Sequence, residues 1–349
     1  MIGLGALTMK SNRVVKVSFE SPQVHQDAVV IVGDKKYSEY GFFLAQQLKV
    51  MEPDRQFDIC VLSTEDFNPP SELTDDVRFG KAIFSAKQMK GIRTDHRIGF
   101  ESYLRIFLPF EMREYSRILY LDADIMQRRP GAQSLLNLNM NGKPIAASRD
   151  GNYCGVLKIR RAQRRYLRKV NQSTENYFNA GVLLIHTEKY IEFLRDDHIL
   201  QELEDSASFL KVHDQSYLNM KFKSNVHLIS PSWNFPMVDE FIESIHIADP
   251  IFLHFVGQTK PWLKTDHPVR KLYVLEFTQF LEEHFQIREF SSAAEPRHSA
   301  NATRKYRNPL HEWVAWRMSK ARFSRARNRA PHVVRALVDR YRNQIEESV

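Results

Sequence analysis

The sequence predicts an α/β fold, in which helices cover both faces of a mostly parallel sheet. Short apolar runs recur along the chain with helix-like stretches between them, as expected for alternating strands and helices. The runs are rich in valine, isoleucine and leucine and do not alternate strictly with polar residues, which is typical of strands buried on both faces. With 349 residues, 43% of them hydrophobic, the chain is long enough to form a substantial core.

Seven apolar runs are the predicted strands, and they comprise residues 28–32, 58–62, 117–121, 144–148, 181–186, 226–230 and 251–255. Between the first two, residues 38–50 have a helical pattern, with Ser38 as the predicted N-cap and Phe42, Leu44, Ala45 and Leu48 facing the sheet. These elements predict a main α/β domain over residues 27–290. An N-terminal extension, 1–26, precedes it, and a basic, aromatic, helical region, 291–349, follows it.

The net charge of +8 is concentrated in two segments. Residues 297–342 hold 13 lysines and arginines against two acids, a local charge of +11, and residues 158–169 hold seven cations and no acid. The remainder of the chain therefore carries −10, which argues against a nucleic-acid-binding protein, since such proteins are basic over their binding face.

The C-terminal cations are mixed with Trp313, Trp316 and Phe323. This composition suits a helix that lies on an anionic membrane surface, while a solvated tail or a nucleic-acid arm stays open as an alternative. The apolar start, residues 1–9, is too short to span a bilayer and lacks the features of a signal peptide. Only Cys60 and Cys154 are present, which favours a reducing compartment. We therefore expect a cytoplasmic protein, peripheral on the inner face of the cytoplasmic membrane.

The most informative stretch is the apolar run 117–121, which ends in Asp122-Ala123-Asp124. Ligands gather at the carboxyl ends of strands in open α/β sheets. Two carboxylates in that place suit a hard divalent cation that also binds a diphosphate. From these residues alone, a metal site and an ordinary loop pair are equally good interpretations.

Further motifs surround this run in a definite order: Gly33 to Tyr37, Tyr103-Leu104-Arg105, Leu121 to Asp124, Tyr177 to Val182, His213-Asp214-Gln215 and His254 to Trp262. Over about residues 29–262 the chain thereby resembles glycosyltransferase family 8, the family of glycogenin and of lipopolysaccharide galactosyl- and glucosyltransferases. The resemblance implies that residues 27–290 are the catalytic domain of a hexosyltransferase, with a GT-A fold built on a Rossmann-like nucleotide-binding sheet. Such an enzyme moves glucose or galactose from UDP-glucose or UDP-galactose to an oligosaccharide or lipid-linked acceptor and retains the anomeric configuration.

The resemblance also implies which residues bind the donor. It places manganese, or alternatively magnesium, on Asp122, Asp124 and His254. The UDP-sugar would contact Gly33, Asp34, Tyr37, Arg105, Asp122, Ala123, Asn179, Ala180, Gly257 and Lys260. Chemically, Lys260 suits the neutralisation of diphosphate oxygens, and Gly257 permits close approach of the backbone.

Each of these residues also has an ordinary structural interpretation. Asp34 and Tyr37 suit a turn with a packed tyrosine, and Arg105 suits a surface ion pair. His254 suits a satisfied histidine at a strand end, and Asn179-Ala180 suits a tight turn into a strand.

Catalysis is assigned by the same resemblance to Gln215, with Asp214 and Asp150 close to the donor sugar and the acceptor. An amide oxygen is a poor nucleophile, so Gln215 favours attack from the same face over a covalent intermediate. The related lipopolysaccharide enzymes often have an acid after the glutamine, whereas Ser216 stands here, which weakens any role for that position. A catalytically silent UDP-sugar-binding module stays an alternative, although both metal carboxylates are present.

The basic segment 158–169 lies between Asp150 and the Asn179 motif, an interval that the family places beside the acceptor. As a helix it would align Ile159, Ala162, Tyr166 and Val170 on one face and direct the cations outward. A solvated charged face is one interpretation. The alternative is an acceptor that carries phosphate and is recruited by Arg161, Arg164, Arg165 and Arg168.

Overall fold

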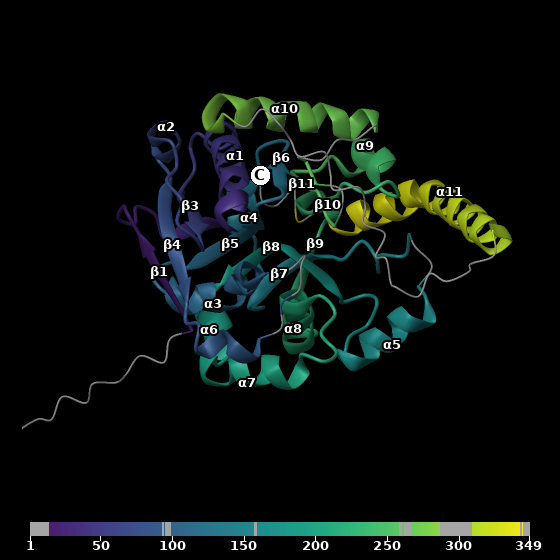
Figure 1. The fold of residues 1–349 in the computed structure, drawn as a ribbon, viewed down its shortest axis with the longest axis horizontal. Helices are drawn as coiled ribbons and strands as arrows, with labels where there is room; N and C mark the ends of the chain where they lie inside the picture. Colours follow the sequence, from purple (N-terminus) through teal and green to yellow (C-terminus); the bar gives the residue numbers. More distant parts are fainter. Residues whose placement is uncertain are drawn as a thin grey trace, which may run out of the picture.

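The computed structural model describes residues 14–92, 94, 99–156, 159–257, 260–261, 267–286, 309–342 and 344 (Figure 1). Strands and helices alternate along the chain, and the helices cover both faces of a central sheet, which confirms the predicted α/β fold. Within the described residues, no helix is both long and apolar enough to cross a membrane. Both cysteines are buried and unpaired.

The central sheet has eight strands in the order β1-β4-β3-β2-β5-β8-β7-β9. Their bounds are β1 (Val15–Phe19), β2 (Asp27–Gly33), β3 (Phe57–Ser63), β4 (Arg78–Phe84), β5 (Arg117–Asp122), β7 (Ile145–Arg149), β8 (Phe178–His186) and β9 (Val226–Ile229). Strands β4, β3, β2 and β5 are parallel, whereas β8 runs antiparallel to both of its neighbours, β5 and β7. A smaller sheet joins β10 (Phe235–Pro236), β11 (Phe252–His254) and β6 (Ile125–Gln127).

All seven predicted strands are present; six join the central sheet, and the run 251–255 forms β11 in the smaller sheet. Strand β3 is buried over its whole length. The prediction missed the edge strand β1, its neighbour β4, and the short strands β6 and β10. Strand β1 pairs antiparallel with β4, so part of the segment before residue 27 joins the sheet. The domain boundaries stay predictions.

Eleven α-helices lie within the described residues, together with four short 3₁₀ turns. The helices are α1 (Lys35–Met51), α2 (Ser71–Thr74), α3 (Leu104–Glu111), α4 (Ala132–Leu136), α5 (Arg161–Lys169), α6 (Thr187–Phe193), α7 (Asp196–Ser206), α8 (His213–Phe222), α9 (Ile245–Ala248), α10 (Pro268–Phe285) and α11 (Pro309–Arg340). The 3₁₀ turns are η1 (Gln88–Gly91), η2 (Phe100–Tyr103), η3 (Pro231–Trp233) and η4 (Ile242–Ser244). One hydrophobic core lies on the α1, α10 and α11 side of the sheet and the other on the α3, α6 and α8 side (Figure 1).

Helix α1 begins earlier than predicted. Its N-cap is Asp34, whose Oδ1 accepts a hydrogen bond from the backbone N–H of Tyr37 at 2.7 Å. Ser38 as N-cap was therefore wrong, because its hydroxyl lies inside the first turn and donates to the carbonyl of Asp34. The preceding turn is tight, since a Cβ on Gly33 would lie 2.5 Å from the carbonyl carbon of Tyr37.

Helix α5 forms within the basic segment, and its arginines face outward as predicted. Tyr166 and Val170 are buried, but Ala162 is exposed, so that part of the predicted stripe was wrong. The buried residues of α5 are Tyr166 and Leu167, in its second half. The first turn of the helix, which contains Ala162, faces solvent.

The C-terminal half of α11 packs on the body, the α/β structure built around the two sheets. Ala326, Ala330, Val334 and Leu337, spaced three and four residues apart, are buried in the core that contains η4 and α9. Arg325, Arg329 and Arg335 on the other face are exposed. The side chains of Trp313, Trp316 and Phe323, which belong to the predicted membrane contact, lie outside the described residues.

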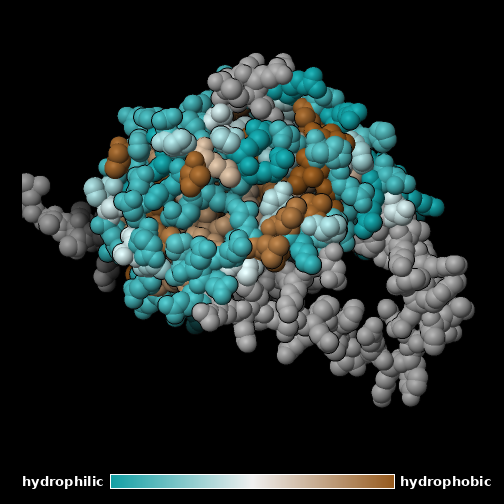
Figure 2. Space-filling view, turned by 90° about the horizontal axis from the view of Figure 1, so that it is seen from above, coloured by the Kyte–Doolittle hydropathy of each residue, from teal (hydrophilic) through white to brown (hydrophobic). Residues whose placement is uncertain are grey.

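The surface seen from the side of α10 is mainly hydrophilic, with a few hydrophobic groups (Figure 2). Leu272 and Leu275 on α10 are exposed. These exposed leucines serve as controls for substitution of Leu337, the buried leucine of α11.

We expect Leu337→Ala to lower the free energy of unfolding by about 3 kcal/mol, because it removes packing between α11 and the body. The measurement is urea denaturation of the full chain. The control Leu272→Ala removes the same atoms from an exposed position and should change stability by less than about 0.5 kcal/mol. Equal effects of the two substitutions would show that α11 is not packed on the body in solution.

Candidate functional site

The topology gathers the predicted site residues at one edge of the central sheet. Strands β2 and β5 are parallel and in register, with Val32 opposite Asp122, so both end at this edge. Because β8 runs the other way, it begins where β5 and β7 end, and Phe178 pairs with Arg149. Residues after β2, β5 and β7 and at the start of β8 therefore meet in space.

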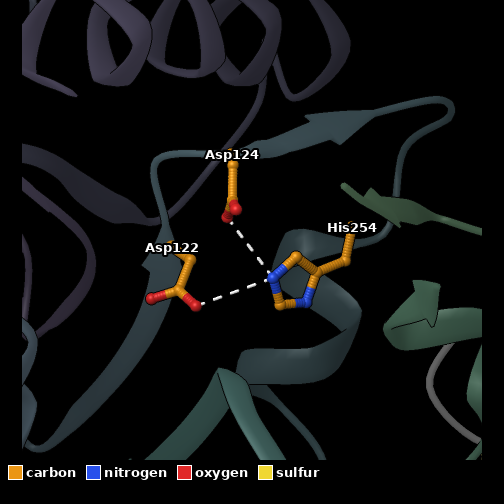
Figure 3. A group of neighbouring side chains, drawn as sticks. All are labelled: Asp122, Asp124 and His254. Carbon is orange, nitrogen blue, oxygen red and sulfur yellow. Dashed lines mark ion pairs between the residues drawn. The ribbon is translucent and has the colours of Figure 1, made fainter. Parts of the chain in front are cut away.

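Asp122, Asp124 and His254 form a compact cluster at this edge (Figure 3). Nε2 of His254 lies 3.3 Å from a carboxylate oxygen of Asp124 and 3.6 Å from one of Asp122. The three potential ligand atoms lie within 4.8 Å of one another, and Asp124 and His254 are buried. Two carboxylates and one imidazole are a donor set that fits a borderline divalent metal such as Mn²⁺.

Strand β8 passes directly against this cluster. A Cβ on Gly181 would lie 2.2 Å from Cε1 of His254 and 2.7 Å from a carboxylate oxygen of Asp122. Only glycine leaves room for both side chains, so the Asn-Ala-Gly sequence at the start of β8 has a steric reason. The tight-turn interpretation of Asn179 and Ala180 is not needed, because both residues lie within the strand.

Arg105, on α3, is a buried cation between two carboxylates. Its guanidinium contacts Asp122 at 2.8 Å and Asp214 at 2.9 Å, and it donates to the carbonyl of Ala180 at 2.7 Å. Burial alone would lower the pKa of Arg105, but Asp122 and Asp214 outweigh it and raise the pKa. Arg105 therefore does form ion pairs, but they are buried within the site, so its interpretation as part of a surface ion pair was wrong.

Lys260 supplies a second cation and pairs with Asp124. Burial alone would raise the pKa of Asp124, but the neighbouring Lys260 and His254 outweigh this effect and hold the pKa well below its usual range. In the same way, burial opposes the charge on Lys260, but Asp124 keeps the pKa of the lysine raised. Asp214 behaves differently, since burial raises its pKa despite the neighbouring Arg105.

Gln215, at the start of α8, connects two parts of the site. Its Nε2 donates to Asp150 at 3.1 Å, and its Oε1 accepts from the backbone N–H of Ala180 at 3.1 Å. Asp150 also accepts from the backbone N–H of Asn152 at 2.8 Å. The following residue, Ser216, hydrogen-bonds Tyr166 of α5 and therefore has a structural role.

The residues predicted to meet the nucleotide lie after β2. Asp34 caps α1 while Tyr37 lies half-buried in the first turn. Burial raises the pKa of Tyr37, and the positive charge of nearby Lys260 offsets only part of this rise.

Two small residues complete the predicted donor site. Ala123, which separates Asp122 from Asp124 in the sequence, is buried. Gly257, with φ of +67°, lies in the turn after β11. Residues 258, 259 and 262 of the last motif lie outside the described residues.

One polar residue of this site was not predicted. Asn234, just after η3, hydrogen-bonds both His254 and Asn179. It stands alone in a Ser-Trp-Asn-Phe-Pro sequence, far from both partners along the chain. The only signal in the sequence was a polar residue between two apolar aromatic ones.

The chain is similar to proteins of a known family. A model of the family described as "Glycosyl transferase family 8" matches residues 28–266. The lipopolysaccharide 1,3-galactosyltransferase of Salmonella typhimurium is 26% identical over 198 residues, which cover 52% of this chain and 54% of that protein. The lipopolysaccharide 1,2-glucosyltransferase of Escherichia coli is 28% identical over 163 residues, which cover 42% and 44%.

The crystal structure of the galactosyltransferase LgtC in complex with donor and acceptor sugar analogs has a similar fold. It superposes with a TM-score of 0.61 at 20% identity and covers 75% of this chain and 98% of that one. The chain spans about half the length of the two curated relatives.

Proposed function

Because the chain belongs to glycosyl transferase family 8, we propose that it is a retaining hexosyltransferase that uses a UDP-sugar. It moves glucose or galactose to a saccharide or lipid-linked acceptor in the synthesis of lipopolysaccharide or another surface glycan. The observation that carries the proposal is the convergence of Asp122, Asp124 and His254 at the end of β5, next to buried Arg105 and Lys260. The two relatives, by name a galactosyl- and a glucosyltransferase, support the choice of sugar.

Departure of UDP from the sugar leaves negative charge on the diphosphate. A divalent cation held by Asp122, Asp124 and His254, with manganese as the first choice, would supply positive charge to those oxygens. Lys260 adds a cation from the segment after β11, and Gly257 lets the backbone approach the phosphates. Arg105 is held by protein carboxylates, so in this proposal it fixes Asp122 and Asp214 in addition to facing the donor.

The sugar lies between the metal ligands and Gln215. In this proposal Asn179, Ala180 and Ala123 line its channel, and Asp34 with Tyr37 receives the uracil. The amide of Gln215 is fixed by Asp150 and by the backbone of Ala180, which holds it in place to stabilise positive charge on the ring during attack from the same face. Asp150 and Asp214 are the carboxylates near the acceptor and donor sugars.

The acceptor of this proposal carries phosphate. Helix α5 is anchored by Tyr166, which hydrogen-bonds Ser216 directly after Gln215 and lies 3.3 Å from the hydroxyl of Tyr177. Tyr166 thereby connects α5 to α8, the helix that carries Gln215, which supports a role of the outward arginines in acceptor binding. The arginines of α5 repel one another because no acid lies among them, and an anionic partner would reduce this repulsion.

The exposed basic face of α11 supports a peripheral position on the inner face of the cytoplasmic membrane. The apolar face of its C-terminal half is used in packing on the body. Contact of this half with anionic lipids would therefore be electrostatic.

The direct test is binding of UDP with and without Mn²⁺, measured by calorimetry, together with transfer from UDP-glucose and UDP-galactose. We expect UDP binding to require Mn²⁺, and Asp124→Ala to lose this binding and to lower transfer about 100-fold or more, because metal and leaving-group stabilisation are lost together. The control Asp249→Ala removes an exposed carboxylate elsewhere and should behave as the parent. Full activity of Asp124→Ala in EDTA contradicts the proposal, and manganese-dependent UDP binding without transfer or hydrolysis would indicate a silent binding module.

For Gln215→Ala we expect turnover to fall about 100-fold while UDP affinity changes little, because the amide acts mainly on the transition state. Steady-state kinetics and calorimetry measure the two quantities. Gln201→Ala, an exposed glutamine on α7, is the control. Unchanged turnover would move the catalytic role to Asp150 or Asp214.

Replacing Arg161, Arg164, Arg165 and Arg168 with glutamine should weaken acceptor capture and flatten its dependence on salt, because screening acts on these charges. The UDP-sugar constant should not change. The matched variant with four lysines keeps the charge and should retain part of the capture, since lysine lacks the fork that binds phosphate. If the acceptor constant and its salt response match the parent, α5 is only a charged surface.

A further inference from the structure

A chain of hydrogen bonds links the start of β8 to His254 through Asn234. Oδ1 of Asn179 lies 3.0 Å from the backbone nitrogen of Gly181 and 2.9 Å from Nδ2 of Asn234. Oδ1 of Asn234 lies 2.9 Å from Nδ1 of His254. Asn234 and His254 are both buried, so water does not replace these contacts.

One end of this chain has a fixed direction. The backbone N–H of Gly181 can only donate, so the atom of Asn179 that faces it is the oxygen. The same oxygen requires a donor from Asn234, which is therefore its amide nitrogen. The amide oxygen of Asn234 then faces His254, and an oxygen without a proton needs a donor, so Nδ1 of His254 carries the proton.

In the neutral imidazole, the other ring nitrogen is thereby available as a ligand. Nε2 faces Asp124 and Asp122, and with the proton on Nδ1 its lone pair points into the cluster of potential metal ligands. A hydrogen bond from Nδ1–H also fixes the ring orientation and raises the basicity of Nε2.

Local structure holds Asn234 in this place. Trp233 and Phe235 on either side are buried in the core, and the backbone N–H of Asn234 donates to Pro231 at 3.2 Å. Strand β10 pairs with β11 directly afterwards, with Pro236 opposite His254. The amide therefore has little freedom to turn away from the histidine.

We propose that Asn234 is a positioning residue that selects the Nδ1–H tautomer of His254 and so prepares Nε2 to bind a divalent metal. Because Asn179 orients Asn234, the residue assigned to the donor channel and the metal ligand share one hydrogen-bond chain. This inference deepens the proposed function, since it concerns the same metal site, but the tautomer is a property of the protein before metal binds.

The first test is ¹⁵N NMR of the metal-free full chain with ¹⁵N-labelled histidine, at alkaline pH, with the His254 signals identified by comparison with His254→Gln. We expect a protonated Nδ1 and an unprotonated Nε2. A proton on Nε2 in the parent protein would overturn the proposal without any need for a variant. If this pattern is found but the parent binds no Mn²⁺, the tautomer assignment stands and the proposed metal-dependent function fails.

The second test compares two substitutions by the same NMR measurement and by titration with Mn²⁺ alone, followed by electron paramagnetic resonance. Asn234→Leu has similar size but no acceptor, so we expect the tautomer to change and Mn²⁺ affinity to fall about 10–100-fold. Asn234→Asp keeps an acceptor opposite Nδ1, so it should retain the tautomer and most of the affinity even though it loses the donor to Asn179.

Ser232→Ala is the control for a general loss of stability. Its hydroxyl donates to the carbonyl of Ala248 at 2.6 Å, in the same segment but without contact to His254. It should lower stability and leave both the tautomer and Mn²⁺ affinity unchanged. A folded Asn234→Leu protein with the parent's tautomer and Mn²⁺ affinity would overturn the proposal.

Discussion

The buried charge on Arg105 is the interaction on which the site depends. Asp122 and Asp214 approach the same guanidinium, and a third carboxylate, Asp124, lies two residues beyond the end of β5. Carboxylates placed together at low exposure repel one another and lose hydration, which is tolerated only with paired cations. Arg105 provides one of these and Lys260 the other. By donating also to Ala180, Arg105 fixes the carboxylates relative to β8.

The same arrangement explains why residues distant in sequence act together. Gly181 lets β8 lie against the histidine and the aspartate, and the amides of Asn179, Asn234 and Gln215 make the polar connections across this contact. The amides of Asn234 and Gln215 each use both ends on protein partners, and the oxygen of Asn179 accepts two hydrogen bonds, which restricts the rotation of all three. A rigid polar framework of this kind holds a reacting group in place before substrate arrives.

Much of the fold could be predicted, because both-face burial produces apolar runs that are visible in the sequence. Strand β4 was missed because Arg78, Gly80 and Lys81 interrupt its pattern, and β1 lies on the edge, where burial does not impose a run. The start of α1 was misplaced because Ser38 and Asp34 are both good caps, and only the tight turn at Gly33 decides between them. Asp122, Asp124 and His254 came from motifs. Asn234 did not, because its role exists only through contacts that the fold creates.

The packing of α11 has a practical consequence for anyone who shortens this protein. The docked half of the helix is its C-terminal half, while the first half extends away from the body (Figure 1). Trimming from the C-terminus would therefore remove the packed half first, leave the projecting half behind, and uncover the apolar residues of η4 and α9 that α11 now covers. Such a product would tend to aggregate, since newly exposed apolar patches associate.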